Sequence, residues 1–442
     1  KLFHPEDPTL LPVDPPNLRQ FFKAVDEREA RIQDLLRHIL IRRTRRHILQ
    51  WYGQQDEKGR KYVLLKDKPF YFPERELETI TYSIDKTYAH LYDKIYEAIR
   101  SLQYAKYGLW HYVKPSLQDK TPYRELEKSG RNLRGLMKVL LLKRFESSVE
   151  AFRETIRRLI RIHEAFLKAM NQGIIPAGEE AQELLYDAEG EDEQLLMEQL
   201  EIASRKYDAK DFELERLKED IKFDVETLKS IKHMVDPIKP SDDDKLEQLI
   251  KLLNHKDVKG KKTIIFTQYA DTVKYLYQNL NKFANIAFAY SKAKNRLHVV
   301  RLFAPKSNNY KLREGEQEIM MLVSTDILSE GLNLQDAYVV INYDIHWNPV
   351  RLIQRIGRVD RMGAIAEVVQ AYNFLPETAL ERLLGLHQKI ARRIQEIHET
   401  IGEDAKILDK SEQLNEEAMY AIYERKDSAA LDDYEARYDI FG

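Results

Sequence analysis

Two arginines in the segment LIQRIGRVDRMG, residues 352–363, have the type and spacing needed to bind a phosphate group. Gln354, Arg358 and Arg361 stand at positions i, i+4 and i+7, so a helix would place all three on one face. The other side of this helix would carry an apolar stripe of Leu352, Ile356 and Val359. Guanidinium groups are planar, permanently charged and suited to phosphate oxygens. The segment therefore predicts an anchored helix that presents two cations to an anionic ligand.

The competing interpretation of this helix is that its arginines form internal ion pairs, with Asp360 or with carboxylates elsewhere. The charge balance bears on this choice. Residues 261–375 contain 15 Lys and Arg against 10 Asp and Glu, whereas the rest of the chain contains 56 against 63. A basic module in an acidic chain favours an anionic ligand, either nucleic acid or nucleotide. The same balance also fits an ordinary solvated surface, so charge alone leaves both interpretations open.

Strands and helices alternate around the arginine segment. Five short apolar runs predict strands at 263–267, 285–290, 318–324, 337–343 and 367–374. Helical patterns lie between these runs, and the arginine segment is one of them. This alternation is typical of a parallel sheet with helices on both faces. Because ligands of such sheets bind outside the carboxyl ends of the strands, we expect the arginines to act there.

The first half of the chain predicts a helical protrusion. Residues 70–84 alternate with a period of two, as in a strand. Apolar residues then keep helical spacing over 133–171 and 214–231, which predicts two long antiparallel helices. The segment between them, 177–204, has ten acidic residues and no basic one, and we interpret it as a solvated or disordered linker. His163 lies on an apolar stripe and is expected in the core.

Composition excludes several kinds of site. The chain has no cysteine, so it forms no disulfide and no thiolate metal site, which is typical of the reducing cytoplasm. Its twelve histidines show no ligand-like spacing, and we therefore expect no zinc. No apolar run approaches the ~20 residues that span a bilayer, and no signal peptide is evident. The chain begins at Lys1 without methionine, so we expect a fragment of a longer protein.

The arginine segment and the residues before it resemble a known family. Motifs V and VI of superfamily-two helicases and translocases are similar to LVSTDILSEGLNLQDAYVVINYDIHWNPVRLIQRIGRVDRMG, residues 322–363. Within that superfamily the segment most resembles the Swi/Snf-type ATPases of the bacterial RapA-like (HepA) branch, which recycle RNA polymerase. The motif IV region is similar to residues 245–280. The resemblance covers about 1–100 and 240–392, with the motifs in the order that the family has.

The resemblance implies an α/β fold, the RecA-like (P-loop NTPase-like) helicase C-terminal lobe, with a large, mainly α-helical insertion. It also implies roles for particular residues. Arg358 and Arg361 match the catalytic motif VI arginines that reach the γ-phosphate of ATP held on the opposite lobe. Gln354 matches the motif VI glutamine near the nucleotide, and Gly331 and Asn333 match motif V positions near the phosphates and ribose.

A second set of residues is implied to contact nucleic acid. Ser324 and Thr325 match positions that touch the backbone, and Thr267 and Gln268, after the motif IV strand, match a second backbone contact. Hydroxyls and free amide groups at strand ends can bind phosphates of any sequence. The competing interpretation of Ser324 and Thr325 is that they cap a short helix predicted at 326–330.

Other parts of such a motor are missing from the sequence. Motor ATPases of this class need a phosphate loop of the form G-x-x-x-x-G-K-[ST] and a carboxylate for magnesium. The nearest match to the loop, GKKT at 260–263, lacks the first glycine, and no Asp-Glu pair follows a buried strand. We therefore expect ATP and Mg²⁺ to be bound mainly by a first lobe outside this chain, and the chain alone to be inactive as an ATPase.

The expected organisation has four parts. They are the end of a first-lobe appendage with the interlobe crossing at 1–70, a helical protrusion at 71–235 that includes the acidic linker at 177–204, the RecA-like lobe at 236–392, and a helical C-terminal tail at 393–442.

Three functions remain open from sequence. The first is the C-terminal half of an ATP-driven translocase on double-stranded DNA, a cytoplasmic enzyme of the nucleoid. The second is a module that binds a protein partner, such as RNA polymerase, through its helical arms. The third is a true strand-separating helicase, although nothing in the sequence resembles a separating pin. We expect no membrane partner.

Overall fold

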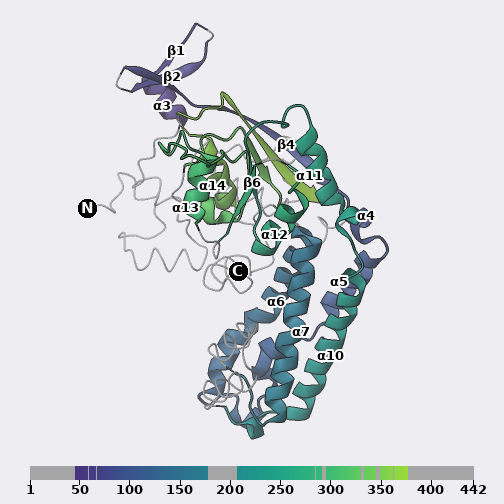
Figure 1. The fold of residues 1–442 in the computed structure, drawn as a ribbon. Helices are drawn as coiled ribbons and strands as arrows, with labels where there is room; N and C mark the ends of the chain where they lie inside the picture. The colour runs from purple at the N-terminus through teal and green to yellow at the C-terminus, as the bar shows by residue number, and fades with distance from the viewer. Residues whose placement is uncertain are drawn as a thin grey trace, which may run out of the picture.

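The protein, described here from a computed structural model, consists of an α/β lobe and a long helical arm (Figure 1). The structure describes residues 45–57, 59–65, 67–177, 207–283, 285–290, 295–329, 333–344, 349–361 and 363–376. Nearly all of the predicted acidic linker at 177–204 and the whole of the predicted tail at 393–442 lie outside these residues.

A six-stranded parallel sheet forms the centre of the lobe. Its strand order is β4-β9-β8-β5-β7-β6, and every neighbouring pair is parallel. The strands are β4 Glu74–Tyr82, β5 Thr263–Phe266, β6 Ile286–Ala289, β7 Met321–Ser324, β8 Val339–Asn342 and β9 Val368–Pro376. Strands β5, β7 and β8 are buried at every position, as expected when both faces of a sheet are covered. The predicted α/β fold with a parallel sheet is confirmed.

Helices connect the successive strands and pack on the sheet. They are α11 Asp244–Asn254, α12 Ala270–Asn279, α13 Arg296–Phe303 and α14 Pro349–Val359, together with the 3-10 turns η5 Pro240–Asp242 and η6 Asp326–Ser329. Helix α11 begins at a side-chain cap, because Asp243 accepts a hydrogen bond from the backbone nitrogen of Leu246 at 3.2 Å. The turn η6 lies close to the short helix predicted at 326–330, and α14 carries Arg358.

Strand β4 belongs to the lobe, although the sequence analysis placed it in the helical protrusion that began at residue 71. It pairs in parallel with β9 over its whole length, from Glu74 opposite Val368 to Tyr82 opposite Pro376. Most of its side chains alternate between exposed and half-buried, as in a strand at the edge of a sheet. The period of two predicted the strand but not its partner, because pairing between segments so far apart leaves no local signal in the sequence.

A small antiparallel sheet precedes β4. Helix α3 (Arg45–Tyr52) leads into β1 (Gly53–Gln55), β2 (Lys61–Leu65) and β3 (Lys68–Tyr71), which pair in that order. The backbone nitrogen of Gly363 donates to the backbone oxygen of Tyr71 at 3.2 Å, and Arg60 forms an ion pair with Glu367. These contacts attach the small sheet to the lobe beside the start of β9.

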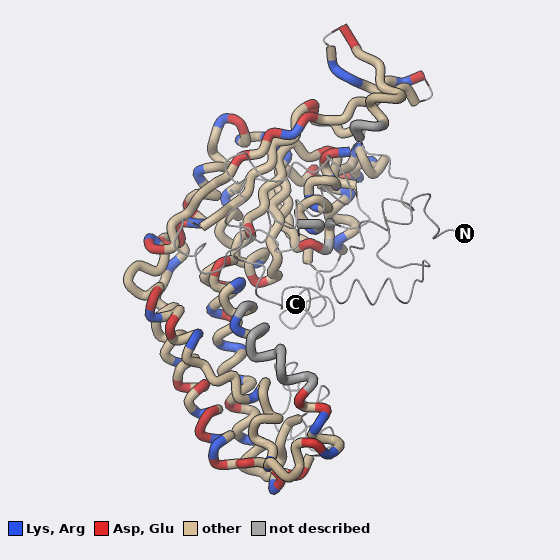
Figure 2. The backbone as a smooth tube through the Cα atoms, turned by 180° about the vertical axis from the view of Figure 1, so that it is seen from behind, with Lys and Arg blue, Asp and Glu red and all other residues tan. Residues whose placement is uncertain are grey.

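The arm consists of helices that run away from the lobe side by side (Figure 1). Its elements are α4 Ile84–Tyr88, α5 Leu91–Ser101, η2 Ala105–Tyr112, η3 Pro115–Leu117, α6 Tyr123–Ser147, α7 Val149–Asn171, η4 Ala209–Asp211 and α10 Leu214–Val235. Buried side chains such as Phe166, Leu217 and Ile221 form a core of their own in its distal part. Basic and acidic residues are interspersed along its described backbone, so neither sign of charge dominates its sequence (Figure 2).

The helix predicted over 133–171 is wrong as a single element. Helices α6 and α7 meet at Ser148, whose backbone is extended with φ −161° and ψ 155°. The Ser148 hydroxyl accepts from the backbone nitrogen of Ala151 at 3.1 Å and so caps α7. Both helices turn apolar side chains toward the same core, and the apolar spacing therefore continues across a break that it cannot reveal.

Two buried basic side chains lie together in the arm. His163 is in the core, as predicted, with Nδ1 2.7 Å from the backbone oxygen of Leu159, and burial lowers its pKa to about 4. Lys106 is 3% exposed and its Nζ lies 4.5 Å from the ring centroid of Tyr107. Burial lowers the pKa of Lys106 to about 7.

No described helix is both long and apolar enough to cross a bilayer. Over the same residues, no group of three or more His, Cys, Asp or Glu side chains is arranged to hold a metal ion.

Candidate nucleotide and nucleic-acid site

Helix α14 turns an apolar side to the sheet and a polar side outward. The predicted apolar stripe is fully buried and consists of Leu352, Ile356 and Val359. On the other side, Gln354 and Arg358 are half-buried and Arg361 is exposed. The helix ends at Val359, before the end predicted at Gly363, so Arg361 lies in the turn that follows the helix.

Arg361 and Asn333, which the sequence analysis assigned to one nucleotide site, are in contact. The Nη1 of Arg361 donates to Asn333 Oδ1 at 3.1 Å, and its Nε donates to the backbone oxygen of Gly357 at 3.0 Å. Asn308 holds Asn333 in turn by donating from Nδ2 to its backbone oxygen at 2.9 Å. Both acceptors of Arg361 are neutral oxygens. In the described part of the chain, Arg361 is therefore an oriented, solvent-facing cation without a contacting carboxylate.

Asp360 has an ion-pair partner outside α14. Its buried carboxylate contacts Nε of Arg75, a residue of the edge strand β4. This argues against the simplest form of the competing interpretation, in which Asp360 serves only the arginines of its own helix. The half-buried Arg358 accepts a hydrogen bond at its backbone oxygen from Leu334 at 3.2 Å. The last turn of α14 is thus fixed to β4 and to the turn that contains Asn333.

Gln354 carries an unsatisfied acceptor. Its side-chain Oε1 is buried and has no hydrogen-bond partner within the described structure. A buried polar atom without a partner costs roughly 1–3 kcal/mol, so a donor supplied by a ligand would relieve that cost. Gln354 therefore fits a nucleotide site next to α14. Gly331, the remaining residue predicted for that site, lies outside the described residues.

Arg355, the remaining arginine of the segment, stabilises the fold and does not face a ligand. It is fully buried and pairs with both carboxylate oxygens of Asp326, at 2.7 Å for the Nη2–Oδ2 contact. Its Nη1 also donates to the backbone oxygen of Asp344 at 2.9 Å. Burial lowers the pKa of Arg355, but the Asp326 and Asp344 carboxylates together outweigh burial, and the pKa is raised overall. Helical spacing could have revealed this role, because Arg355 follows Leu352 by three positions and precedes Val359 by four, on the apolar side.

The arginines do not lie at the carboxyl ends of the strands, where the sequence analysis expected them. Helix α14 runs antiparallel to β8: Arg355 reaches Asp344, just after β8, whereas Arg358 bonds to Leu334, before β8 begins. Its last turn therefore lies toward the amino end of β8. The reason is geometric, because a crossover helix must carry the chain back across the sheet before the next parallel strand can start.

Two of the predicted nucleic-acid residues have buried side chains. Thr267 and Ser324 are fully buried. The Thr267 hydroxyl donates to Asp344 Oδ2 at 2.6 Å, and the Ser324 hydroxyl donates to the backbone oxygen of Thr325 at 2.8 Å. Both hydroxyls therefore bond inside the protein and are not available to an external phosphate.

The other two predicted nucleic-acid residues are partly accessible. Gln268 and Thr325 are half-buried, but their backbone nitrogens already donate, to Asp344 Oδ1 at 2.7 Å and to the Ala289 oxygen at 3.1 Å. Neither backbone nitrogen is therefore free to donate to a phosphate. Thr325 also stands immediately before η6. Its backbone oxygen accepts from the Leu328 backbone nitrogen at 3.4 Å, as the backbone oxygen of an N-cap residue does. Their side chains remain the groups that could reach a nucleic-acid backbone.

A buried polar network occupies the carboxyl edge of the sheet instead. We call Ser147, Thr267, Thr272 and Asp344 the root cluster, because it joins the root of the arm to the lobe. Asp344 Oδ2 accepts from the Ser147 hydroxyl at 2.7 Å and from the Thr267 hydroxyl at 2.6 Å. Ser147 also lies 2.8 Å from the Thr272 hydroxyl on α12. The last residue of α6 therefore bonds directly to residues that follow β5 and β8.

Buried ion pairs strengthen the same junction. The Nζ of Lys245 on α11 lies 3.2 Å from Glu146 Oε1, and both side chains are 4% exposed. Burial raises the pKa of Glu146, while Lys245 opposes that rise. Arg144 Nη1 lies 3.0 Å from Asp271 Oδ2 on α12. The arm is therefore attached to the lobe through several charged and polar contacts rather than through one flexible crossing.

Comparison with known proteins identifies the central segment. Residues 244–363 match the family described as helicase conserved C-terminal domain. This range contains β5 to β8 and α14, so the RecA-like part of the lobe is similar to helicase C-terminal domains.

Individual relatives are similar over the same part of the chain. An uncharacterised ATP-dependent helicase, YqhH of Bacillus subtilis, is 33% identical over 166 residues, which are 36% of this chain and 27% of the relative. The putative DEAD-box ATP-dependent RNA helicase 44 of Arabidopsis thaliana is 33% identical over 170 residues, or 37% of this chain and 24% of the relative. The matched segment thus spans about a quarter of each of these relatives.

Among solved structures, the C-terminal part of the Fun30 ATPase domain is similar at a TM-score of 0.37 and 15% identity, covering 84% of this chain and 99% of the other.

Proposed function

We propose that the chain is the C-terminal half of an ATP-dependent nucleic-acid translocase or remodeller of the Swi/Snf type. Arg361 carries this proposal, because it is an exposed guanidinium held in place by Asn333 and Gly357, and no carboxylate among the described residues contacts it. In the proposal, Arg358 and Arg361 contact a triphosphate bound by a separate lobe and stabilise the charge that develops on the transferred phosphoryl group. Gln354 accepts a hydrogen bond from the same nucleotide.

The residues present fit one side of an ATP site. ATP bound with Mg²⁺ supplies the phosphoryl group and the hydrolysis energy. Arg361 supplies positive charge, and the unsatisfied Oε1 of Gln354 supplies an acceptor. The described residues offer no carboxylate cluster for a metal ion, so in this proposal the metal is held by the other lobe. The role of this chain is then to orient the triphosphate and to neutralise its charge, and not to bind magnesium.

The proposed nucleic acid is double-stranded DNA, contacted by the side chains of Gln268 and Thr325. RNA is the second candidate, because relatives matched over this segment are named ATP-dependent RNA helicases. Competition of labelled duplex DNA against duplex and single-stranded RNA, in the full-length protein, distinguishes these polymers. Preference for single-stranded RNA would contradict the Swi/Snf assignment while leaving the arginine proposal intact.

Substitution of Arg361 tests the proposed catalytic role. In the full-length protein, Arg361→Ala is expected to lower kcat for ATP hydrolysis by about 10³-fold, since arginine fingers contribute on the order of 10³–10⁵. Arg301→Ala, which removes an exposed arginine from α13, serves as the control and is expected to keep wild-type turnover. Equal turnover by Arg361→Ala and the control would refute the proposal. This chain alone is expected to show no turnover, and Arg361-dependent hydrolysis by it would contradict the separate-lobe assignment.

A protein-binding role for the arm is a second candidate. The arm projects far from the lobe, and α10 exposes a large apolar side chain, Phe223, which is 47% accessible (Figure 1). The partner considered is a DNA-bound protein such as RNA polymerase. Retention of the full-length protein on immobilised RNA polymerase should then fall with Phe223→Ser but not with Arg361→Ala. Unchanged retention in Phe223→Ser would rule out this surface.

A further inference from the structure

The orientation of Arg361 depends on a turn that another part of the lobe holds in place. Arg361 bonds to the backbone oxygen of Gly357, in the same stretch of chain, and to Asn333 Oδ1 at 3.1 Å. The bond to Asn333 is therefore the contact that fixes the guanidinium relative to a separate segment. This segment comprises residues 333–337, just before β8, and we call it the Asn333 turn.

Asn308 supports the Asn333 turn from the segment that follows α13. Its Nδ2 donates to the backbone oxygen of Asn333 at 2.9 Å and to the backbone oxygen of Ala304 at 2.8 Å. Both hydrogens of the amide group are therefore used, and the half-buried side chain has a defined orientation. Asn333 thus connects Asn308, through its backbone oxygen, with Arg361, through its side-chain oxygen.

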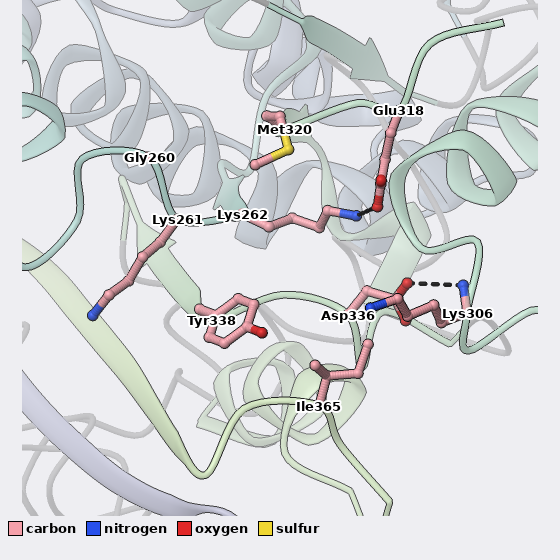
Figure 3. A pocket seen from close by; sticks show the side chains of 9 residues that line it. All are labelled: Gly260, Lys261, Lys262, Lys306, Glu318, Met320, Asp336, Tyr338 and Ile365. Atoms are coloured by element: carbon pink, nitrogen blue, oxygen red, sulfur yellow. Dashed lines mark hydrogen bonds and ion pairs between the residues drawn. The ribbon is translucent and has the colours of Figure 1, made fainter.

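Asp336 joins the same two segments in the opposite direction. Its carboxylate accepts from the backbone nitrogens of Lys306 and Ser307, both at 2.9 Å, and from the Ser307 hydroxyl. Figure 3 shows the bond between Asp336 and the Lys306 nitrogen as a dashed line. Asp336 is 2% exposed, so removing these donors would leave a buried charge without compensation. The Asn333 turn and the segment after α13 therefore hold each other from both sides.

The supporting segment has hydrogen bonds of its own. The Asn308 nitrogen donates to the Ala304 oxygen at 3.2 Å. The Tyr310 nitrogen donates to the Pro305 oxygen at 2.8 Å, and its hydroxyl bonds to both carboxylate oxygens of Glu316, at 3.0 and 2.8 Å. A support that is ordered in this way can keep a catalytic side chain in place before substrate arrives.

We propose that Asn308 is a positioning residue for phosphoryl transfer, because it holds the Arg361 guanidinium, through Asn333, in the orientation that meets the triphosphate. This inference rests on the proposed function of Arg361. It adds a residue that the sequence analysis did not assign to the site. Misplacement of a catalytic group by 1 Å can lower a rate by about 10²-fold, so loss of the support lowers the rate even though the cation remains.

Asn308→Ala in the full-length protein removes the amide donor and leaves Arg361 intact. We expect kcat for ATP hydrolysis to fall by roughly 10- to 10²-fold, less than the ~10³-fold expected for Arg361→Ala. KM for ATP should stay within about twofold, because a contact made in the transition state changes kcat and not ground-state binding. Wild-type kcat in Asn308→Ala, with a lowered kcat in Arg361→Ala, would overturn the inference and leave the proposed function standing.

Asn279→Ala is the matched control. The half-buried Asn279 also donates from Nδ2 to the backbone oxygen four residues earlier, that of Tyr275, at 2.8 Å, and its amide makes no other bond in the described structure. It is expected to keep wild-type turnover. An equal fall of kcat in both variants would show a general loss of stability and rule the inference out. Thermal unfolding verifies folding, and Asn308→Leu, which keeps the volume without the donor, replaces Asn308→Ala if that variant is unfolded.

A double variant separates positioning from an independent structural effect. If Asn308 acts through Arg361, then adding Asn308→Ala to Arg361→Ala should lower kcat no further than Arg361→Ala alone. Losses that multiply would mean that Asn308 acts by another route, against the inference.

The orientation of Arg361 can also be measured without turnover. NMR relaxation of the isotope-labelled guanidinium, assigned by its absence from Arg361→Ala, should give a lower order parameter in Asn308→Ala than in the wild-type chain. Asn279→Ala should leave it unchanged, and an unchanged value in Asn308→Ala would refute the positioning role. A lower value in Asn308→Ala together with wild-type turnover by Arg361→Ala would instead contradict the proposed function, while Asn308 would still be shown to orient Arg361.

Discussion

Two arginines of the segment that forms and follows α14 have different environments in this protein. Arg355 is fully buried against Asp326, whereas Arg361 is exposed and bonds only to neutral oxygens among the described residues. The difference follows from position, because Arg355 faces the sheet and Arg361 lies beyond the last helical turn. The family resemblance placed Arg361 and Asn333 in one nucleotide site, and the sequence analysis assigned no role to Arg355.

A single buried amine gives a pH test at the residue scale. Lys106 has its pKa lowered to about 7 by burial, from an unfolded value of 10.5. Between these two values the unfolded chain holds a proton that the folded chain has released, so the free energy of unfolding rises with pH in that window. Below about 7 both states are protonated and this contribution stops changing.

Lys106→Met removes that titration. The variant is expected to be more stable than the wild type near pH 7, by at most about 5 kcal/mol at ~1.36 kcal/mol per pKa unit, and the gain should shrink toward pH 10. Urea unfolding of both proteins at several pH values measures the gain. The exposed Lys222→Met is the control and should show no such trend. His163 lies nearby but titrates below this window, so it does not produce the effect. A pH-independent difference would contradict a buried, neutral Lys106.

At the scale of elements, Ser148 decides where the arm turns into two helices. Its hydroxyl caps α7 through Ala151 and lies 2.9 Å from the Thr272 hydroxyl of the lobe. Ser148→Ala is expected to lower the free energy of unfolding by about 1–2 kcal/mol, the usual cost of losing an N-cap. Ser101→Ala, at an exposed serine in the last turn of α5, is the comparison and should cost less than about 0.5 kcal/mol. Equal effects of the two substitutions would mean that the cap contributes nothing.

The helices and strands show which structural features can be predicted from patterns in the sequence. Apolar runs of four or more residues predicted β5 to β9, because buried parallel strands leave a continuous local signal. The break at Ser148 was missed, since its cause is a local backbone turn and the apolar period carries on through it. The partner of β4 was missed for a different reason. The alternating pattern of residues 74–82 predicts a strand but is the same whichever strand it pairs with.

The burial of Thr267 and Ser324 could not be predicted from the sequence either. Both stand at strand ends, where a hydroxyl often faces a ligand, and nothing local distinguishes the two cases. The Thr267 hydroxyl is engaged by Asp344, which Ser147 of the arm also bonds. Only the folded arm brings Ser147 to that edge, so the site could be judged only with the arm in place.

For the whole molecule, the root cluster is the connection between the arm and the lobe. Ser147 and Thr267 both donate to Oδ2 of Asp344, one from each part of the molecule. Ser147→Ala and Thr267→Val should therefore be non-additive in the free energy of unfolding, with an interaction energy of about 0.5–3 kcal/mol. A double-mutant cycle by urea unfolding measures it.

The cycle needs a pair of distant sites for reference. Ser147→Ala combined with Ser101→Ala should be additive within about 0.5 kcal/mol, because Ser101 makes no contact with the root cluster. If the effects of Ser147→Ala and Thr267→Val on the free energy of unfolding are equally additive, Asp344 does not couple the arm to the lobe, despite its short hydrogen bonds to both residues.

The position of β4 has a consequence for how the chain is made. Glu74 pairs with Val368, so the edge strand leaves the ribosome almost three hundred residues before its partner exists. At roughly 5–20 residues per second, that interval lasts on the order of 15–60 s. Throughout it, the half-buried face of β4 must remain shielded by the nascent arm or by a chaperone, since an unpaired strand edge invites pairing with other chains. A shortened gene that starts at residue 236 lacks β4, so its product contains β9 without a neighbouring strand on that side. We expect this product to aggregate.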